Sequence, residues 1–156
     1  MALPGAARRA DPNVSVAGFI DVETTGLDPA AHEVVELAIA LVAFDRETGD
    51  ILGIVDEYAG LRDPGFPIPA DATRVHGLRS TDVRGKRLDD ARIRAMLERA
   101  EFLVAHNASF DKAFVTKLFP EVQRKRWVCS MRSIPWKQKG FPSRGLQSLV
   151  GHCLQE

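Results

Sequence analysis

The sequence predicts an α/β fold in which a mixed five-stranded sheet is covered by helices. Three apolar, β-branched runs come first, and shorter helix and strand patterns then alternate to the end of the chain. Strands joined by short turns pair antiparallel, whereas strands separated by helices pair in parallel. The 156 residues are enough for one domain with its own core and too few for two.

Each element follows from local patterns in chain order. The segment 14–22 is an apolar strand, and the residues Glu47-Thr48-Gly49-Asp50 form the hairpin turn between the next two strands. Pro120 ends a helix that starts at Ser109. The predicted strands are 14–22, 34–44, 51–58, 102–105 and 127–130. The predicted helices are 70–76, 89–100, 109–118 and 146–154. Residues 1–13 lack an apolar segment and are expected to be a disordered leader, which leaves residues 14–156 as the domain.

Charge is balanced over the chain but divided between its halves. Residues 1–73 contain 4 Lys/Arg and 13 Asp/Glu, whereas residues 74–156 contain 17 and 8. Two explanations of this division are open. Charged residues on solvated helix faces would produce it, and so would an acidic metal site in one half with a phosphate-facing basic surface in the other. No apolar run is long enough to span a bilayer, so no membrane partner is expected. Two cysteines without metal-type spacing indicate a reducing compartment, here the cytoplasm.

A pair of acids near the end of the first strand is the first candidate site. Residues two apart in a strand point to the same face, so Asp21 and Glu23 project together. Two neighbouring carboxylates repel each other, and Mg²⁺ or Mn²⁺, which prefer oxygen ligands, would relieve that repulsion. The alternative is a half-exposed strand with polar residues outward, although Asp is disfavoured in strands.

A third acid falls where the fourth strand leads into a helix. Asp111 lies in the predicted first turn, where the positive end of the helix dipole stabilises a carboxylate. A simple helix start, with Asn107 as the N-cap, explains the same pattern. By itself Asp111 therefore does not indicate a metal site.

Taken together, these segments resemble the DEDD exonucleases, in particular the branch like the proofreading subunit of bacterial DNA polymerase III. Residues 19–27, FIDVETTGL, are similar to the first family motif, and residues 106–111, HNASFD, to the second. Between them, residues 75–78, VHGL, followed by Thr81, resemble a helix start of the family. The segment 129–149 also looks like this family, so the resemblance covers about residues 15–156.

The resemblance implies a ribonuclease H-like fold and two ions, Mg²⁺ or Mn²⁺. Asp21 would bridge both ions, Glu23 would hold the first, and Asp111 would support the second. These three residues are therefore the expected catalytic and metal-binding set. The implied reaction is in-line hydrolysis of a phosphodiester at a 3′ end.

Seven further residues are expected, by resemblance, around the 3′-terminal nucleotide. Leu27 would wedge between the last two bases, or else it is a turn residue that caps the core. His76 and Phe110 would line the nucleotide pocket, or else they pack beside the sheet. The full set is Thr24, Thr25, Gly26, Leu27, His76, Asn107 and Phe110.

The third family motif, a general-base His followed five residues later by Asp, is not found after the second motif. His152 is the only late histidine, and residues 145–154 match the helix that precedes that motif in the family. We therefore expect the chain to stop before the motif and its final helix, which puts the activity of these 156 residues in doubt.

The expected function is that of a 3′→5′ exonuclease acting on single-stranded DNA in proofreading or repair. Its partners would be a single-stranded 3′ end and, by resemblance, a DNA polymerase. Two alternatives stay open. One is an RNA exonuclease, because no residue decides whether a 2′-hydroxyl is tolerated. The other is a catalytically incomplete remnant that binds nucleic acid or a polymerase.

Overall fold

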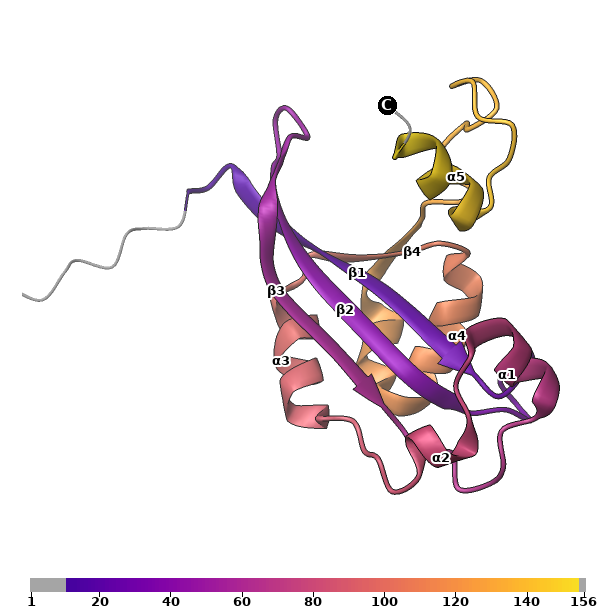
Figure 1. Cartoon of the computed structure of the whole chain (residues 1–156). Coiled ribbons are helices and arrows are strands. Elements are labelled where there is room, and N and C mark those ends of the chain that lie inside the picture. Colours follow the sequence, from indigo (N-terminus) through magenta and orange to yellow (C-terminus); the bar gives the residue numbers. More distant parts are fainter. Residues whose placement is uncertain (1–10, 155–156) are drawn as a thin grey trace, which may run out of the picture.

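A twisted five-stranded sheet forms the centre of the molecule in a computed structural model that describes residues 11–154 (Figure 1). The strand order is β3-β2-β1-β4-β5. The strands are β1 (Val14–Thr24), β2 (Val34–Asp45), β3 (Ile51–Leu61), β4 (Phe102–Ala105) and β5 (Arg126–Cys129).

The pairing follows the connections between the strands. β1, β2 and β3 pair antiparallel, whereas β4 pairs in parallel with β1 and with β5. The register places Asp21 opposite Ala38 and Glu23 opposite Glu36. The predicted mixed five-stranded sheet is therefore confirmed.

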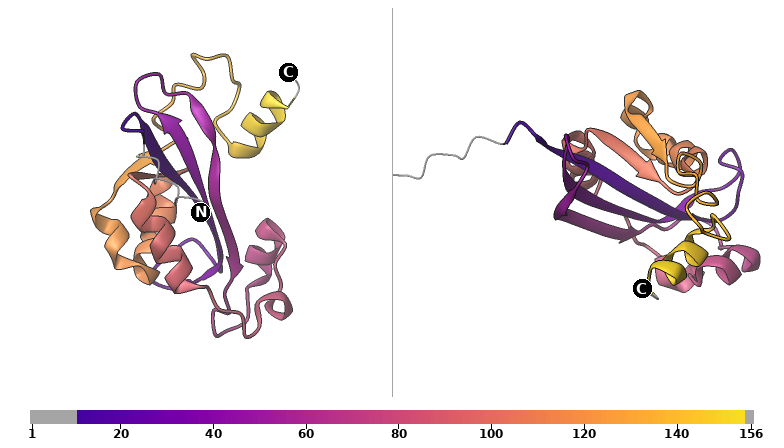
Figure 2. Two further views of the ribbon diagram at one scale, coloured as in Figure 1. Left: turned by 90° about the vertical axis from the view of Figure 1, so that its left-hand side faces the viewer. Right: turned by 90° about the horizontal axis from the view of Figure 1, so that it is seen from above.

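Helices lie on both sides of the sheet (Figure 2, left). α3 (Asp90–Arg99) and α4 (Ala108–Leu118) cover one face, and the other side carries α1 (Ala70–His76), α2 (Ser80–Val83) and α5 (Leu146–Cys153). A 3₁₀ helix, η1 (Pro120–Arg124), leads into β5. The main core fills the space between the sheet and α3 and α4, and includes Ile20, Val22, Leu37, Ile39, Ile93, Met96, Leu103 and Phe114.

The structure departs from the predicted elements in several places, which include the unpredicted 3₁₀ helix η1. The short helix α2 was not predicted, because four residues carry too little periodic signal. β1 and β3 continue beyond residues 22 and 58, since strand pairing extends them past the apolar runs. In α5 only Leu149 is buried, whereas Leu146 and Val150 are about half exposed.

The leader was predicted at residues 1–13, of which residues 1–10 lie outside the described residues. Residues 11–13 form a turn, where Asn13 accepts a backbone hydrogen bond from Arg46 of 2.8 Å. Cys129 and Cys153 are free thiols. Within residues 11–154, the helices are all too short or too polar to cross a membrane.

Candidate active site

Two carboxylates stand on the face of β1 that points away from the core. Asp21 and Glu23 alternate with Ile20 and Val22, whose side chains are 4% and 5% exposed and pack beneath the sheet. The strand period of two therefore puts both acids on one side, close to the end of β1 at Thr24.

Asp111 reaches the same place from α4. It lies in the first turn of this helix and is 2% exposed. The backbone N–H of Val22 donates to Oδ1 of Asp111 at 3.2 Å. The carboxyl group of Asp111 is therefore held against β1 at Val22, the residue between Asp21 and Glu23. The fold brings together three acids that are up to 90 positions apart.

The electrostatics show that the three acids affect one another. Burial, and then the charges of Asp21 and Glu23, raise the pKa of Asp111 to about 7. Burial also raises the pKa of Asp21, which is exposed as a whole but whose carboxyl group is partly shielded from water, and the nearby His106 opposes that rise. Burial, followed by the charge of Asp21, raises the pKa of Glu23. Each acid thus resists ionising, chiefly because it is buried.

The chemistry of these donors fits a divalent cation. Asp21, Glu23 and Asp111 offer oxygen ligands, and a cation would offset the burial, and in Glu23 and Asp111 also the repulsion, that raise their pKa values. As the side chains stand, however, no three His, Cys, Asp or Glu residues in the described part of the chain are grouped as ligands of one ion. The acids share one strand end without forming a ready-made three-ligand group.

A cavity of about 630 Å³ opens beside this strand end. Its wall combines the end of β1, the turn that follows, α1 and the start of α4. All seven residues predicted to surround a nucleotide line it, together with Glu23: Thr24, Thr25, Gly26, Leu27, His76, Asn107 and Phe110. The structure therefore brings this entire set to one cavity.

Leu27 and Phe110 differ in how they meet the cavity. Leu27 is 83% exposed and does not cap the core. Phe110 is half-buried, and its ring lies 5.0 Å from that of Phe114 in the core. Phe110 thus belongs to both the cavity wall and the core packing, whereas Leu27 is free to contact a ligand.

His76 is fixed by backbone hydrogen bonds on both sides of its ring. Leu78 N–H donates to Nδ1 at 3.1 Å, which leaves the proton on Nε2 to bond the carbonyl of Thr24 at 3.2 Å. Gly77 ends α1 with a left-handed φ of 80°, so the chain can turn back at this point. The ring therefore links α1 to the end of β1.

His32 also lines this cavity, and the sequence analysis did not single it out. It is half-buried, and its Nδ1 hydrogen-bonds Oγ1 of Thr25 at 3.1 Å. A Cβ atom on Gly26 would lie 2.5 Å from the ring. The absent side chain of Gly26 therefore makes room for His32, a relation that no short sequence pattern reveals.

Glu36 is another residue that the sequence analysis did not single out. It pairs with Glu23 across β1 and β2, and its charge contributes to the raised pKa of Glu23. The strand alternation in Val34-Val35-Glu36-Leu37 could have identified Glu36 only if the register had been known.

Asn107 precedes α4 in a left-handed conformation with φ 75° and ψ 52°. It is the one non-glycine residue with positive φ among those described, and its side chain makes no capping hydrogen bond. Such a backbone is uncommon for a side chain other than Asn or Asp. The chain turns at Asn107 between β4 and α4. His106 lies before this turn and Asp111 after it, and both are close enough to Asp21 for their charges to interact.

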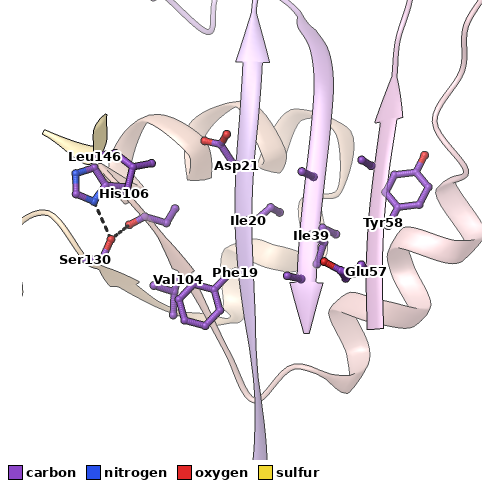
Figure 3. Close-up of a pocket in the computed structure, with 14 residues that line it drawn as sticks. Phe19, Ile20, Asp21, Ile39, Glu57, Tyr58, Val104, His106, Ser130 and Leu146 are labelled. Carbon is purple, nitrogen blue, oxygen red and sulfur yellow. Dashed lines mark hydrogen bonds between the residues drawn. The ribbon is translucent and has the colours of Figure 1, made fainter. Parts of the chain in front are cut away.

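Asp21 borders a different cavity from Glu23, of about 690 Å³, over the open face of the sheet (Figure 3). His106, Ser130 and Leu146 form one side of it, and Tyr58 and Glu57 lie on the other. His106 bonds Oγ of Ser130 through Nδ1 at 3.0 Å and the carbonyl of Arg144 through Nε2 at 2.7 Å. Both ring nitrogens of His106 are thus engaged by the segment after β5.

His152 lies apart from the carboxylates. It lines a different cavity with Lys139, Phe141 and Cys153, and its ring is 5.7 Å from that of Phe141. It lines neither cavity that contains Asp21 or Glu23. In this arrangement His152 is not placed to take a proton near those acids.

The sheet order and the carboxylates at the end of the central strand β1 fit the exonuclease class, and the comparison with protein families agrees. The family model described as Exonuclease (RNase_T) matches residues 19–149. The chain belongs to this family.

Two curated relatives are bacterial polymerases. The chain is 33% identical over 104 residues to the DNA polymerase III PolC-type of Listeria welshimeri, and this match covers 65% of the chain. It is 34% identical over 112 residues to the enzyme of the same name from Streptococcus agalactiae, over 67% of the chain. In both cases the match spans only 7% of the relative's length.

Solved exonucleases share the fold. Exonuclease X in complex with 5′ overhanging duplex DNA is 28% identical, with a TM-score of 0.54 over 80% of this chain and 74% of that one. E. coli Exonuclease I in complex with a 5cy-dA13 oligonucleotide has a TM-score of 0.61 at 18% identity, over 88% of this chain and 35% of that one. The ribonuclease H-like architecture predicted from the sequence is therefore confirmed.

Proposed function

We propose that this domain is a metal-dependent 3′→5′ exonuclease that removes nucleotides from the 3′ end of single-stranded DNA. The observation that carries the proposal is the placement of Asp21, Glu23 and Asp111 around the end of β1, where Val22 N–H holds Asp111 and Glu23 lines a cavity of about 630 Å³. Membership of the exonuclease family supports hydrolysis, and similarity to PolC-type polymerases supports a role in DNA proofreading or repair. Association with a polymerase is part of the same proposal.

In this mechanism the carboxylates would hold Mg²⁺ or Mn²⁺, and the cavity would hold the terminal nucleotide. Divalent ions supply charge stabilisation at phosphate oxygens and lower the pKa of water. Thr24 and Thr25 anchor the strand end, because Thr24 Oγ1 donates to the carbonyl of Gly26 at 2.7 Å and Thr25 Oγ1 accepts from Glu33 N–H at 3.0 Å. That anchored turn presents the exposed Leu27 to a base.

Proton transfer is the weak step for this chain. His76 and His106 have both ring nitrogens hydrogen-bonded, and His152 lies in another cavity. A positioned base typically contributes ~10²–10⁴-fold to a rate. We therefore expect slow hydrolysis by these 156 residues, and a large gain in a longer chain that supplies a histidine base and a fourth carboxylate.

Digestion of an end-labelled single strand tests the proposal. The chain, its Asp21→Ala and Asp111→Asn variants, and Glu98→Gln as a control are compared with Mn²⁺ on DNA and on RNA of the same sequence. Glu98 is exposed on α3, on the far side of the sheet. Shortening from the 3′ end that needs Asp21 and Asp111 but not Glu98 supports the proposal.

The other outcomes are equally informative. Shortening that continues in Asp21→Ala, or that starts at the 5′ end, contradicts the proposed site. Equal digestion of DNA and RNA would show that DNA is not the sole substrate. Binding of the strand without any hydrolysis, also in a longer chain, would favour a remnant that only binds nucleic acid.

Metal binding can be measured separately from activity. Calorimetric titration with Mn²⁺ is expected to show weak binding that Asp21→Asn abolishes, because that change removes the ligand expected to bridge both ions. Binding that survives unchanged in Asp21→Asn would move the metal to other residues.

A further inference from the structure

The connection between β5 and α5 is unusually basic. The chain has no Asp or Glu between Glu121 and Glu156. Residues 130–145, named here the basic connector, contain Arg132, Lys137, Lys139 and Arg144, all exposed. None of these four side chains forms an ion pair within residues 11–154, whereas five of the arginines outside the connector bond a carboxylate on another element. Their charge is therefore available to a ligand.

Both ends of the basic connector are fixed next to the candidate active site. His106 bonds Ser130 at one end and the carbonyl of Arg144 at the other. Ser130 and Leu146 line the cavity over the sheet together with Asp21 (Figure 3). The basic connector thus begins and ends beside the cavity that Asp21 lines.

The aromatic residues of the connector pack inward and leave its charges outward. Trp136 donates from Nε1 to the carbonyl of Ser130 at 2.8 Å, and its ring meets that of Phe141 edge-on at 5.3 Å. Both rings are half-buried, whereas Lys137 and Lys139 between them are exposed. This surface offers exposed cations, whereas its aromatic rings are half-buried against each other, so it suits phosphates better than bases.

We propose that the basic connector binds the sugar–phosphate backbone of the nucleic-acid strand, upstream of the nucleotide in the cavity. The inference rests on the proposed function for the direction of the strand. Three carboxylates at the strand end repel an approaching polyanion, and a basic wall at the same edge offsets that repulsion. Because the contacts are to phosphates, binding is independent of base sequence and falls steeply with salt.

Fluorescence anisotropy with labelled oligonucleotides tests the proposal without hydrolysis. The chain is compared in EDTA, over a range of salt concentrations, with a K137Q/K139Q/R144Q variant and a matched K86Q/R87Q control. Lys86 and Arg87 are also exposed, but they lie between α2 and α3. Near-identical circular dichroism of all three proteins serves as the check on folding.

The expected result is at least a tenfold loss of dT12 binding by the connector variant at low salt, with a dinucleotide affected less than twofold. Each phosphate contact contributes about −0.7 to the slope of log K against log salt for single strands, so three lost contacts reduce the slope by about 2. The K86Q/R87Q control is expected to keep both affinity and slope.

Three results would overturn the inference: an unchanged slope in the connector variant, an equal loss in the control, or polyglutamate binding as tight as dT12. Failure of the proposed function looks different. In that case hydrolysis is absent or independent of Asp21, while the salt-dependent binding measured here is unaffected.

Discussion

The end of β1 and the segment that follows β5 face the same edge of the sheet, yet they are built in opposite ways. Around Asp21, Glu23 and Asp111, the supporting residues come from β1, β2, α1 and α4 and include fully buried core positions. The helix α5 buries Leu149 only and leaves Leu146 and Val150 about half exposed. The end of β1 with its acids is thus held in place by the core. The segment proposed to bind the strand is instead held by a few hydrogen bonds to His106.

The largest difference between the two regions is expected on truncating a fully buried residue of the main core. Ile93 of α3 is 0% exposed and packs against the sheet. Ile93→Ala should lower the free energy of unfolding by about 2–5 kcal/mol, through lost apolar contact and the cavity left behind. Urea denaturation measures this, with the exposed Ala95→Ser on the same helix as the control. A loss below ~1 kcal/mol would mean that α3 does not support the site.

A gain in stability is expected when the buried acid is neutralised. The pKa of Asp111 is about 7 when folded and 3.8 as the reference value. Between these pH values the folded chain holds a proton that the unfolded chain releases, so stability falls as pH rises from about 4 to 7 and remains low above that. Asp111→Asn should therefore stabilise the protein in EDTA at pH 8, by on the order of 2 kcal/mol.

The same variant provides its own check through pH. At pH 5 the gain should fall to less than half, because wild-type Asp111 is then largely protonated in the folded chain. Thermal melting at both pH values measures the difference, and Glu98→Gln is the exposed control. A gain of equal size at pH 5 and pH 8 would show that ionisation of the buried Asp111 is not its cause.

A smaller effect is expected from the ammonium group that fixes the loop behind Gly26. Lys117 Nζ donates to the carbonyls of Pro29 and His32 at 2.7 and 2.8 Å and to Oε1 of Glu33 at 2.9 Å. Lys117→Met keeps the apolar stem and removes these bonds, which should cost about 1 kcal/mol. Hydrogen exchange should quicken in residues 28–33, which support His32 and the cavity. Lys112→Met, on the same helix, should leave that loop unchanged.

The smallest global effect is expected in the weakly packed region. Leu149→Ala removes the one buried side chain of α5 and should lower the free energy of unfolding by less than ~1 kcal/mol, below the usual cost of a core truncation. Amide exchange should quicken in α5 while β1 and α4 stay protected. A loss as large as that of Ile93→Ala would erase the contrast between the two regions.

The sequence by itself determined the five strands and the longer helices, the mixed sheet and the two motifs, because each depends on neighbours close in the chain. Strand alternation alone placed Asp21 and Glu23 on one face. The local sequence pattern placed Asp111 in the first turn of a helix. It did not predict that the N–H of Val22 would donate a hydrogen bond to its carboxylate. The family resemblance, not spacing, linked the two.

Tertiary structure alone decided the remaining features. His32 enters the cavity because β1 and β2 bring the turn back over Gly26, and Glu36 joins the acids through a register set by strand pairing. The basic connector meets Asp21 only because β4 and β5 run in parallel and end at the same edge of the sheet. Each of these contacts joins residues from separate elements, and their proximity depends on how those elements pack, which no local pattern in the sequence specifies.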